Sequence, residues 1–200
     1  MNYGQIRTQF KAILNRTDCS DALADTFMSQ GLLRSQRFLR IPANEKQSTE
    51  VVAGGFTAHT LPSDVMEIIS VVVDDTVVQF LPLKAWTDVP IATNGIPQYW
   101  TRVGTSIRFK PTPSVGASIV VDYYGSFEPF TTDGTTTKLS TVASDVVVYG
   151  GLSYAADYFL DERKAMFEER YLGILADLQA QGYDADGPGQ VGAAYDLEGY

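Results

Sequence analysis

The sequence predicts an α+β fold in which a helical bundle, built from both ends of the chain, carries an inserted antiparallel β-rich domain. Apolar residues recur at helical spacing near both ends, and short alternating runs separated by turn residues fill the middle. The two helical ends must meet to bury their apolar stripes, which favours one fold over two consecutive domains. The expected parts are an N-terminal helical part (1–45), a β-rich insert (46–140), the C-terminal helices (141–182) and an extended C-terminal arm (183–200).

Two amphipathic helices are expected within residues 1–40. Apolar side chains lie at helical spacing from Tyr3 to Leu14, which predicts the first helix. Ser20 is a favourable N-cap for the second helix, and Pro42 is expected to end it. The second helix opens with aspartates and closes with arginines, an order that complements the helix dipole.

The middle of the chain predicts short β-strands joined by turns. Strands are expected at Val51–Val52, Phe56–Thr60, Glu67–Val73, Val77–Phe80, Gln98–Val103, Ser106–Lys110 and Ser118–Tyr124. Asp74-Asp75 is an expected turn that pairs the strands on either side of it. Gly104-Thr105 has glycine first in a two-residue loop, which is typical of a type II′ hairpin. Local meanders of this kind favour antiparallel pairing.

Helical spacing returns after a polar connector that covers residues 126–140. Ser144 is expected to cap a helix, although the run Val146–Val148 favours a strand. Asp161 and Glu162 are expected to open the final helix, and Gly182 to end it. The arm that follows is rich in glycine and acidic residues and cannot build a core of its own.

The arm carries spaced apolar and aromatic side chains. They are Val191, Tyr195, Leu197 and Tyr200. One interpretation is a solvated tail. The other, which we favour, is an arm that orders on a partner, because a tail that only solubilises has little use for three tyrosines.

Charge is distributed unevenly along the chain, whose formal net charge is −9. Residues 1–40 hold six basic and three acidic residues, whereas residues 141–200 hold three basic and eleven acidic ones. The overall sign argues against tight, sequence-independent binding of nucleic acid. No apolar run is long enough to cross a membrane, so no membrane partner is expected.

The sequence predicts no enzyme, no cofactor and no metal site. His59 is the single histidine and Cys19 the single cysteine, which leaves too few ligands for a multi-histidine metal site. No phosphate-binding glycine loop and no nucleophile elbow occur. The carboxylates of Asp157, Asp161 and Glu168 are expected on solvated helix faces, and His59 on a strand at a wet interface.

Two groups of strand residues suggest binding. The aromatic group, which could stack on a sugar or simply pack across strands, is Tyr99, Trp100, Tyr123 and Tyr124. The basic group is Arg102, Arg108 and Lys110, which lie on neighbouring hairpin strands. These three could form a small patch that contacts passing DNA or an acidic neighbour, or could be ordinary surface charge.

Several motifs in order resemble one family. They are Leu61-Pro62-Ser63-Asp64, Glu67–Val71, Gly95–Trp100, Ile107–Pro113, Val121–Tyr124, and Tyr149–Leu152 ahead of Phe167-x-x-x-Tyr171. Their order, and the helix–β–helix layout around them, resembles the head-to-tail adaptor (connector) proteins of tailed bacteriophages. The resemblance is strongest to short-tailed phages with tubular adaptor rings, and it covers roughly residues 1–182.

The resemblance implies a structural virion protein without catalytic residues. Its subunits would form a ring, usually a dodecamer, that is assembled in the host cytoplasm, docks beneath the portal protein and joins the capsid to a tail nozzle or tail tube. DNA would pass without sequence-specific binding, and the arm with Val191, Tyr195, Leu197 and Tyr200 would reach the portal. The alternative is a tail-tube, baseplate or host-glycan-binding module of the virion.

Overall fold

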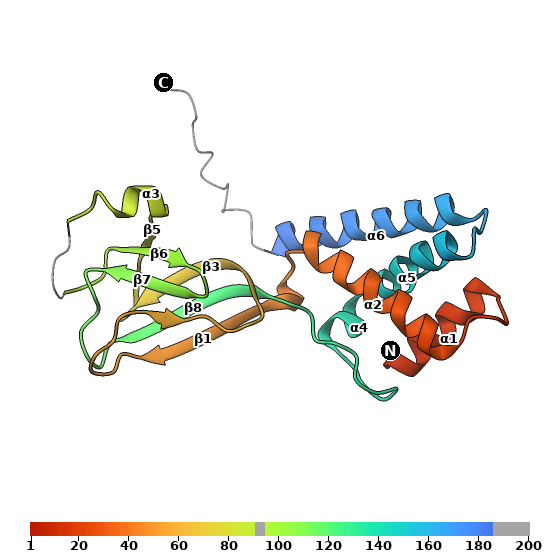
Figure 1. Ribbon diagram of the computed structural model, residues 1–200, viewed down its shortest axis with the longest axis horizontal. Coiled ribbons are helices and arrows are strands. Elements are labelled where there is room, and N and C mark those ends of the chain that lie inside the picture. Colours follow the sequence, from red (N-terminus) through yellow and green to blue (C-terminus); the bar gives the residue numbers. More distant parts are fainter. Residues whose placement is uncertain (91–94, 186–200) are drawn as a thin grey trace, which may run out of the picture. The chain divides into compact units, whose positions relative to one another are not determined.

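The computed structural model describes residues 1–90 and 95–185, which fall into two compact units (Figure 1). The helical unit is built from Met1–Asn44 together with the chain from Phe127 onward, and the β unit is Glu45–Ser126. Each unit has its own hydrophobic core, and the two cores share no residue. This is the expected α+β arrangement of an antiparallel β-rich segment inserted into a helical fold.

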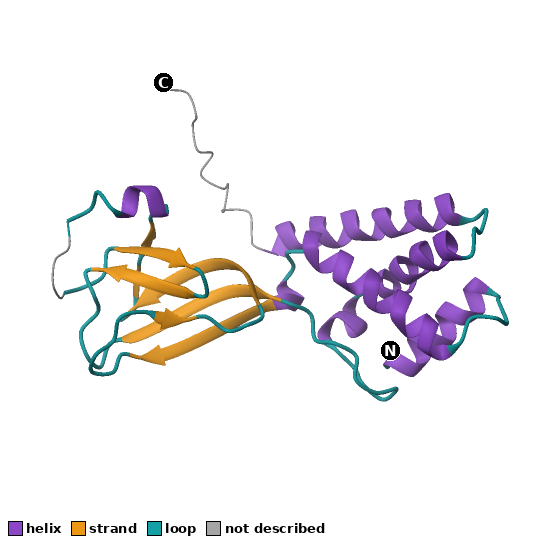
Figure 2. Ribbon diagram, in the orientation of Figure 1, coloured by secondary structure: helices purple, strands orange, loops and turns teal. Residues whose placement is uncertain are grey.

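The helical unit contains the four long helices that the sequence predicts (Figure 2). Its elements are α1 (Tyr3–Leu14), α2 (Asp21–Phe38), the 3-10 turn η1 (Pro42–Asn44), α4 (Lys138–Val142), α5 (Ser144–Tyr158) and α6 (Lys164–Ala185). The side chain of Ser20 caps α2 by accepting a hydrogen bond from the Leu23 backbone N–H, as expected. Ser144 does not cap α5. It is the first residue of that helix, and Ala143 precedes it without a capping side chain.

Helix α5 is the centre of the helical unit because it packs against α1, α2 and α6. The valine run that favours a strand, Val146–Val148, lies inside this helix and is fully buried. Burial of these valines against the neighbouring helices stabilises the helix, so tertiary packing overrides the local β preference here. Gly31 of α2 faces Gly150 and Gly151 of α5, and the absence of side chains lets the two backbones approach closely.

The boundary of the insert differs from the expected one, because residues 127–137 pack on α1 and belong to the helical unit. The ring of Phe130 stacks on Tyr3 with 4.6 Å between centroids, and the Tyr3 backbone N–H donates to the Thr135 carbonyl. The Arg7 guanidinium forms an ion pair with the Asp133 carboxylate at 2.6 Å and a second ion pair with the carboxylate of Asp25 on α2. The segment is polar by composition, so its sequence alone gives no sign of these anchors.

Gly182 does not end the last helix, which continues to Ala185. A Cβ atom at this position would lie 2.9 Å from the carbonyl oxygen of Arg40 and 3.2 Å from the side chain of Ile41. Glycine is therefore required for close approach and not for a left-handed cap. Gln179 also holds α6 against this segment, because its side-chain amide both accepts a hydrogen bond from the Arg40 N–H and donates one to the Arg40 carbonyl.

The β unit is a sandwich of two four-stranded sheets, visible as orange arrows in Figure 2. Its elements are β1 (Glu45–Val51), β2 (His59–Thr60), β3 (Val65–Val73), β4 (Thr76–Val77), β5 (Gln79–Phe80), α3 (Leu83–Trp86), β6 (Tyr99–Val103), β7 (Ser106–Lys110) and β8 (Ser118–Gly125). One sheet has the order β1-β8-β3-β4 and the other β2-β7-β6-β5. Alternate residues of β8 point inward, and both sheets contribute to one core.

Three strand predictions were wrong in extent. Strand β1 begins at Glu45, before the expected Val51, because it is a polar edge strand that needs little apolar signal. Only His59–Thr60 of the expected second strand pairs. The expected strand Val77–Phe80 splits at the buried Val78, and its second half, β5, pairs parallel with β6 in the other sheet.

Candidate functional site

The four arm residues that the resemblance assigns to portal contact lie outside the described residues. They are Val191, Tyr195, Leu197 and Tyr200. The structure does describe the helix that leads toward them, because α6 extends to Ala185. Their role therefore stays a prediction.

The three basic residues of the β6–β7 hairpin do not form one patch. Arg102 lies opposite Ile107 in the antiparallel register, so Arg108, the next residue, points to the other face. Both arginines are exposed. Lys110 is only 7% exposed, and its ammonium group donates to the carbonyls of Trp86 and Val89, the latter at 2.8 Å. This lysine holds the loop after α3 in place and is not available to DNA.

The aromatic strand residues do not form a sugar-stacking platform. Trp100 is buried in the sandwich core and packs against Phe80 with 4.8 Å between ring centroids. Tyr123 is buried as well, and its hydroxyl donates to the carboxylate of Asp64. His59 is likewise buried and pairs with Glu50, which corrects the expectation of a wet interface.

Cys19 and the helix carboxylates named above have structural surroundings. Cys19 is buried, and this burial raises the pKa of its thiol, which disfavours the reactive thiolate. Asp157 pairs with Lys164 on the surface. The Arg163 guanidinium and backbone N–H bind Asp161 and lower the pKa of that carboxyl to about 2. Among the described residues, no cluster of acidic, histidine or cysteine side chains could hold a metal ion.

A polar clamp joins the three central helices of the helical unit. Arg34 of α2 forms two hydrogen bonds with the carboxylate of Glu168 on α6, and the bond from its Nη1 measures 2.9 Å. Ser153 of α5 donates to the same carboxylate. The guanidinium of Arg34 also lies over the ring of Tyr171, 4.7 Å from its centroid. The Arg34 hydrogen bonds lower the pKa of Glu168, so the carboxylate is ionised at neutral pH.

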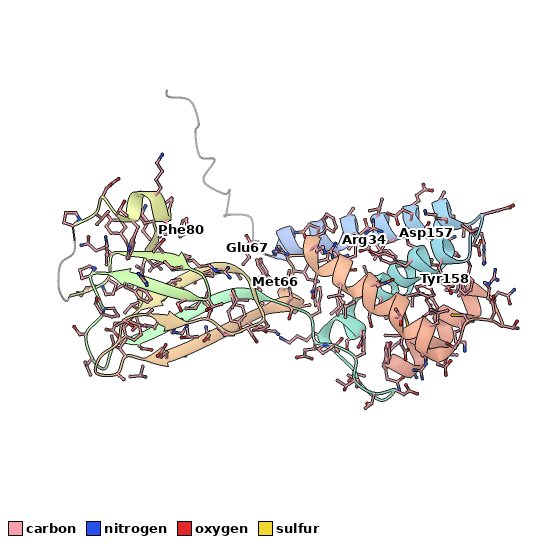
Figure 3. The ribbon with its side chains drawn as sticks, viewed as in Figure 1. Arg34, Met66, Glu67, Phe80, Asp157 and Tyr158 are labelled. Atoms are coloured by element: carbon pink, nitrogen blue, oxygen red, sulfur yellow. The ribbon has the colours of Figure 1, made fainter. Side chains whose placement is uncertain are left out.

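An apolar corner projects from the helical unit where α5 turns into α6. Leu160 is 89% exposed and Tyr158 is 64% exposed (Tyr158 is labelled in Figure 3). The backbone of Leu160 is left-handed, with φ at 52°. This conformation costs a non-glycine residue on the order of 1–2 kcal/mol. A solvent-facing leucine in a strained backbone is unusual, and nothing in its sequence neighbourhood predicted it.

A mostly apolar pocket of about 530 Å³ opens in the helical unit beside α4 and the end of α6. It is lined by Ile41, Pro42, Ala43, Thr136, Thr137, Lys138, Thr141, Val142, Leu178, Gln181 and Gly182. Val142 is 62% exposed on its wall. The sequence gives no sign of this pocket because its walls come from three separate stretches of chain, 41–43, 136–142 and 178–182.

Comparison with known protein families identifies the family of this chain. No protein with a curated description matches the chain. In the described part, no helix has the length and apolar character needed to span a membrane. The family model described as SU10 adaptor protein matches residues 1–192, which is nearly the whole chain. The chain therefore belongs to the SU10 adaptor protein family, a family of phage head-to-tail adaptors.

Proposed function

We propose that this protein forms a ring at the head–tail junction of the virion, below the portal protein, and joins the capsid to the tail nozzle or tail tube. The observation that carries the proposal is the match of an adaptor family model to residues 1–192. The two-unit structure supports it, because each unit has a separate core and can present its own surface to a different neighbour. By its resemblance to ring-forming adaptors, the assembly is a dodecamer put together in the host cytoplasm.

The role is structural and passive. The carboxylates and the cysteine that could serve catalysis are buried or paired in contacts that stabilise the fold. DNA would cross the ring without sequence-specific binding. A net charge of −9 suits such a passage, because a channel that gripped phosphate would slow the DNA. Arg102 and Arg108 remain candidates for transient contact with DNA or with an acidic neighbour, each from its own face of the hairpin.

The arm would connect the ring to the portal. Helix α6 leads into it, and the residues proposed for contact are Val191, Tyr195, Leu197 and Tyr200. Aromatic side chains are enriched at the energetic centres of protein interfaces because they bury large apolar areas and keep a polar group for hydrogen bonding. The ring partners are thus further copies of this chain, the portal on one side and a tail protein on the other.

Co-sedimentation with purified portal rings of the same phage tests the arm. A variant that ends at Ala185 keeps every described residue, and we expect it to lose most of its portal binding while it retains the helical circular dichroism of the full chain. The control is a full-length variant with residues 186–200 in shuffled order, which keeps the charge and loses the spacing. Full binding by the truncated variant would rule out the arm as the portal contact.

A further inference from the structure

We propose that the apolar corner of one copy, formed by Tyr158 and Leu160, docks into the apolar pocket beside α4 and α6 of a second copy. The inference rests on the proposed function in one respect, because it names the contact through which subunits of the ring join. It assigns that contact to two surfaces of the helical unit.

The corner has the exposure of an interface anchor. Two large apolar side chains project within three residues, and Leu160 is 89% exposed. Its left-handed backbone would be relaxed by glycine or asparagine, so stability of the isolated subunit does not explain a leucine there. The left-handed residue closes the C-terminus of α5, where the Asp161 N–H donates to the Ala156 carbonyl, and glycine or asparagine is the usual residue at such a position.

The corner is also held rigidly, which reduces the entropy lost on docking. Arg163 donates to the carbonyls of Ile13 and Leu14 at the end of α1, at 3.1 and 2.9 Å, and to the Asp161 carboxylate. The Asp161 backbone N–H in turn donates to the Ala156 carbonyl at 2.8 Å. The turn that presents Leu160 is thereby tied to both α1 and α5.

The pocket has a size and lining that suit such an anchor. Its volume of about 530 Å³ lies within the range of about 300–1,000 Å³ that is usual for pockets in proteins. Ile41, Val142 and Leu178 offer it apolar walls. Burying the corner there would cover exposed apolar surface on both copies at once.

Charge favours the same pairing. Lys138 on the pocket wall forms no ion pair with any residue in the described part of the chain. Glu162, two residues beyond Leu160, is exposed and has no ion-pair partner in that part either. Docking of Leu160 would bring the carboxylate of Glu162 toward the ammonium group of Lys138, which orients the two copies.

The two surfaces lie at opposite ends of α6, which makes the contact head-to-tail. The corner precedes Lys164 at the start of the helix, and the pocket is reached at Leu178, about 21 Å further along at the usual helical rise of about 1.5 Å per residue. A contact between two different patches of identical subunits repeats from copy to copy and closes into a ring when the rotation permits. One anchor and one pocket per subunit are enough for every junction.

Two single variants of the full-length chain test the two surfaces one at a time. Leu160→Gly removes the anchor and relaxes the left-handed backbone, so the subunit stays folded or gains stability. Val142→Glu places an acid on the exposed pocket wall, where it repels Glu162. In sedimentation velocity over a concentration series, we expect either change to weaken self-association by at least about tenfold. The matched control, Leu172→Ser, alters an exposed leucine on α6 outside both surfaces and should self-associate like the wild type.

Mixing the two variants gives the sharpest outcome. The Leu160→Gly chain keeps a pocket and the Val142→Glu chain keeps an anchor, so the mixture should form a one-to-one dimer and nothing larger. Charge reversal checks the orientation: Lys138→Glu or Glu162→Lys alone should weaken association, and the double variant should restore it. Wild-type protein that is monomeric at every concentration would overturn the inference. Unchanged association of Leu160→Gly would overturn it too, yet would leave the adaptor role standing, since the ring would then close through other surfaces.

Discussion

Replacement of Gly31 by alanine is expected to destabilise the helical unit by about 1–3 kcal/mol. The added methyl group would clash with backbone atoms of α5, which cannot move aside locally. A Cβ atom there would lie 2.6 Å from both the Gly150 carbonyl carbon and the Gly151 nitrogen. Since peptide groups cannot rotate away as a flexible side chain can, α2 and α5 must separate. Urea unfolding followed by helical circular dichroism measures the change.

The same substitution at Gly173 is the matched control for this prediction. Gly173 lies on the exposed face of α6, and an added Cβ would meet nothing within 4 Å. Alanine is favoured over glycine inside a helix by about 0.5–1 kcal/mol, so Gly173→Ala should stabilise the protein. Opposite signs for one substitution would establish the close α2–α5 approach. A neutral Gly31→Ala would contradict it.

The second large effect is expected at the polar clamp. Arg34→Met should cost about 1–3 kcal/mol, because it leaves the half-buried Glu168 carboxylate with Ser153 as its remaining side-chain donor. The control is Lys11→Met, which breaks the exposed pair with Asp21 and should change stability by less than about 0.5 kcal/mol. Equal losses in the two variants would show that the clamp is no stronger than a surface ion pair.

The clamp also predicts a pH dependence. Hydrogen bonds from Arg34 place the pKa of Glu168 in the folded protein below its ordinary value of 4.5. The ionised carboxylate therefore contributes stability that is fully present above the unfolded pKa and is lost as the pH falls through the folded pKa. In Glu168→Gln this dependence disappears. The free energy of unfolding of the wild type should exceed that of the variant at neutral pH, and the difference should shrink as the pH falls below 4.5 and through the lowered pKa of Glu168.

Periodicity was enough to predict most of the secondary structure. The stripe from Tyr3 to Leu14 and the cap at Ser20 mark helices whose apolar faces are one-sided, so their pattern is readable. A strand at Val146–Val148 would have been the local choice, and it fails because all three valines are buried within the packed helix α5. Strand β1 escaped prediction for the opposite reason, since it lies at the edge of its sheet and is largely polar.

The interaction surfaces were less accessible to sequence reasoning. The separation of Arg102 from Arg108 could have been predicted, because a two-residue loop at Gly104-Thr105 pairs 102 with 107 and puts 108 on the other face. The left-handed backbone at Leu160 could not have been predicted, because leucine rarely adopts that conformation. The burial of Lys110 depends on the loop after α3, which is distant in the chain.

Negative-stain electron microscopy of the full-length chain mixed with portal rings of the same phage tests the central proposal most directly. We expect class averages with an added ring that shares the portal axis and lies on one side of it. In the variant that ends at Ala185 the added density should be lost or greatly reduced. Portal rings that look the same with and without the full-length chain would contradict the assignment of this protein to the head–tail junction.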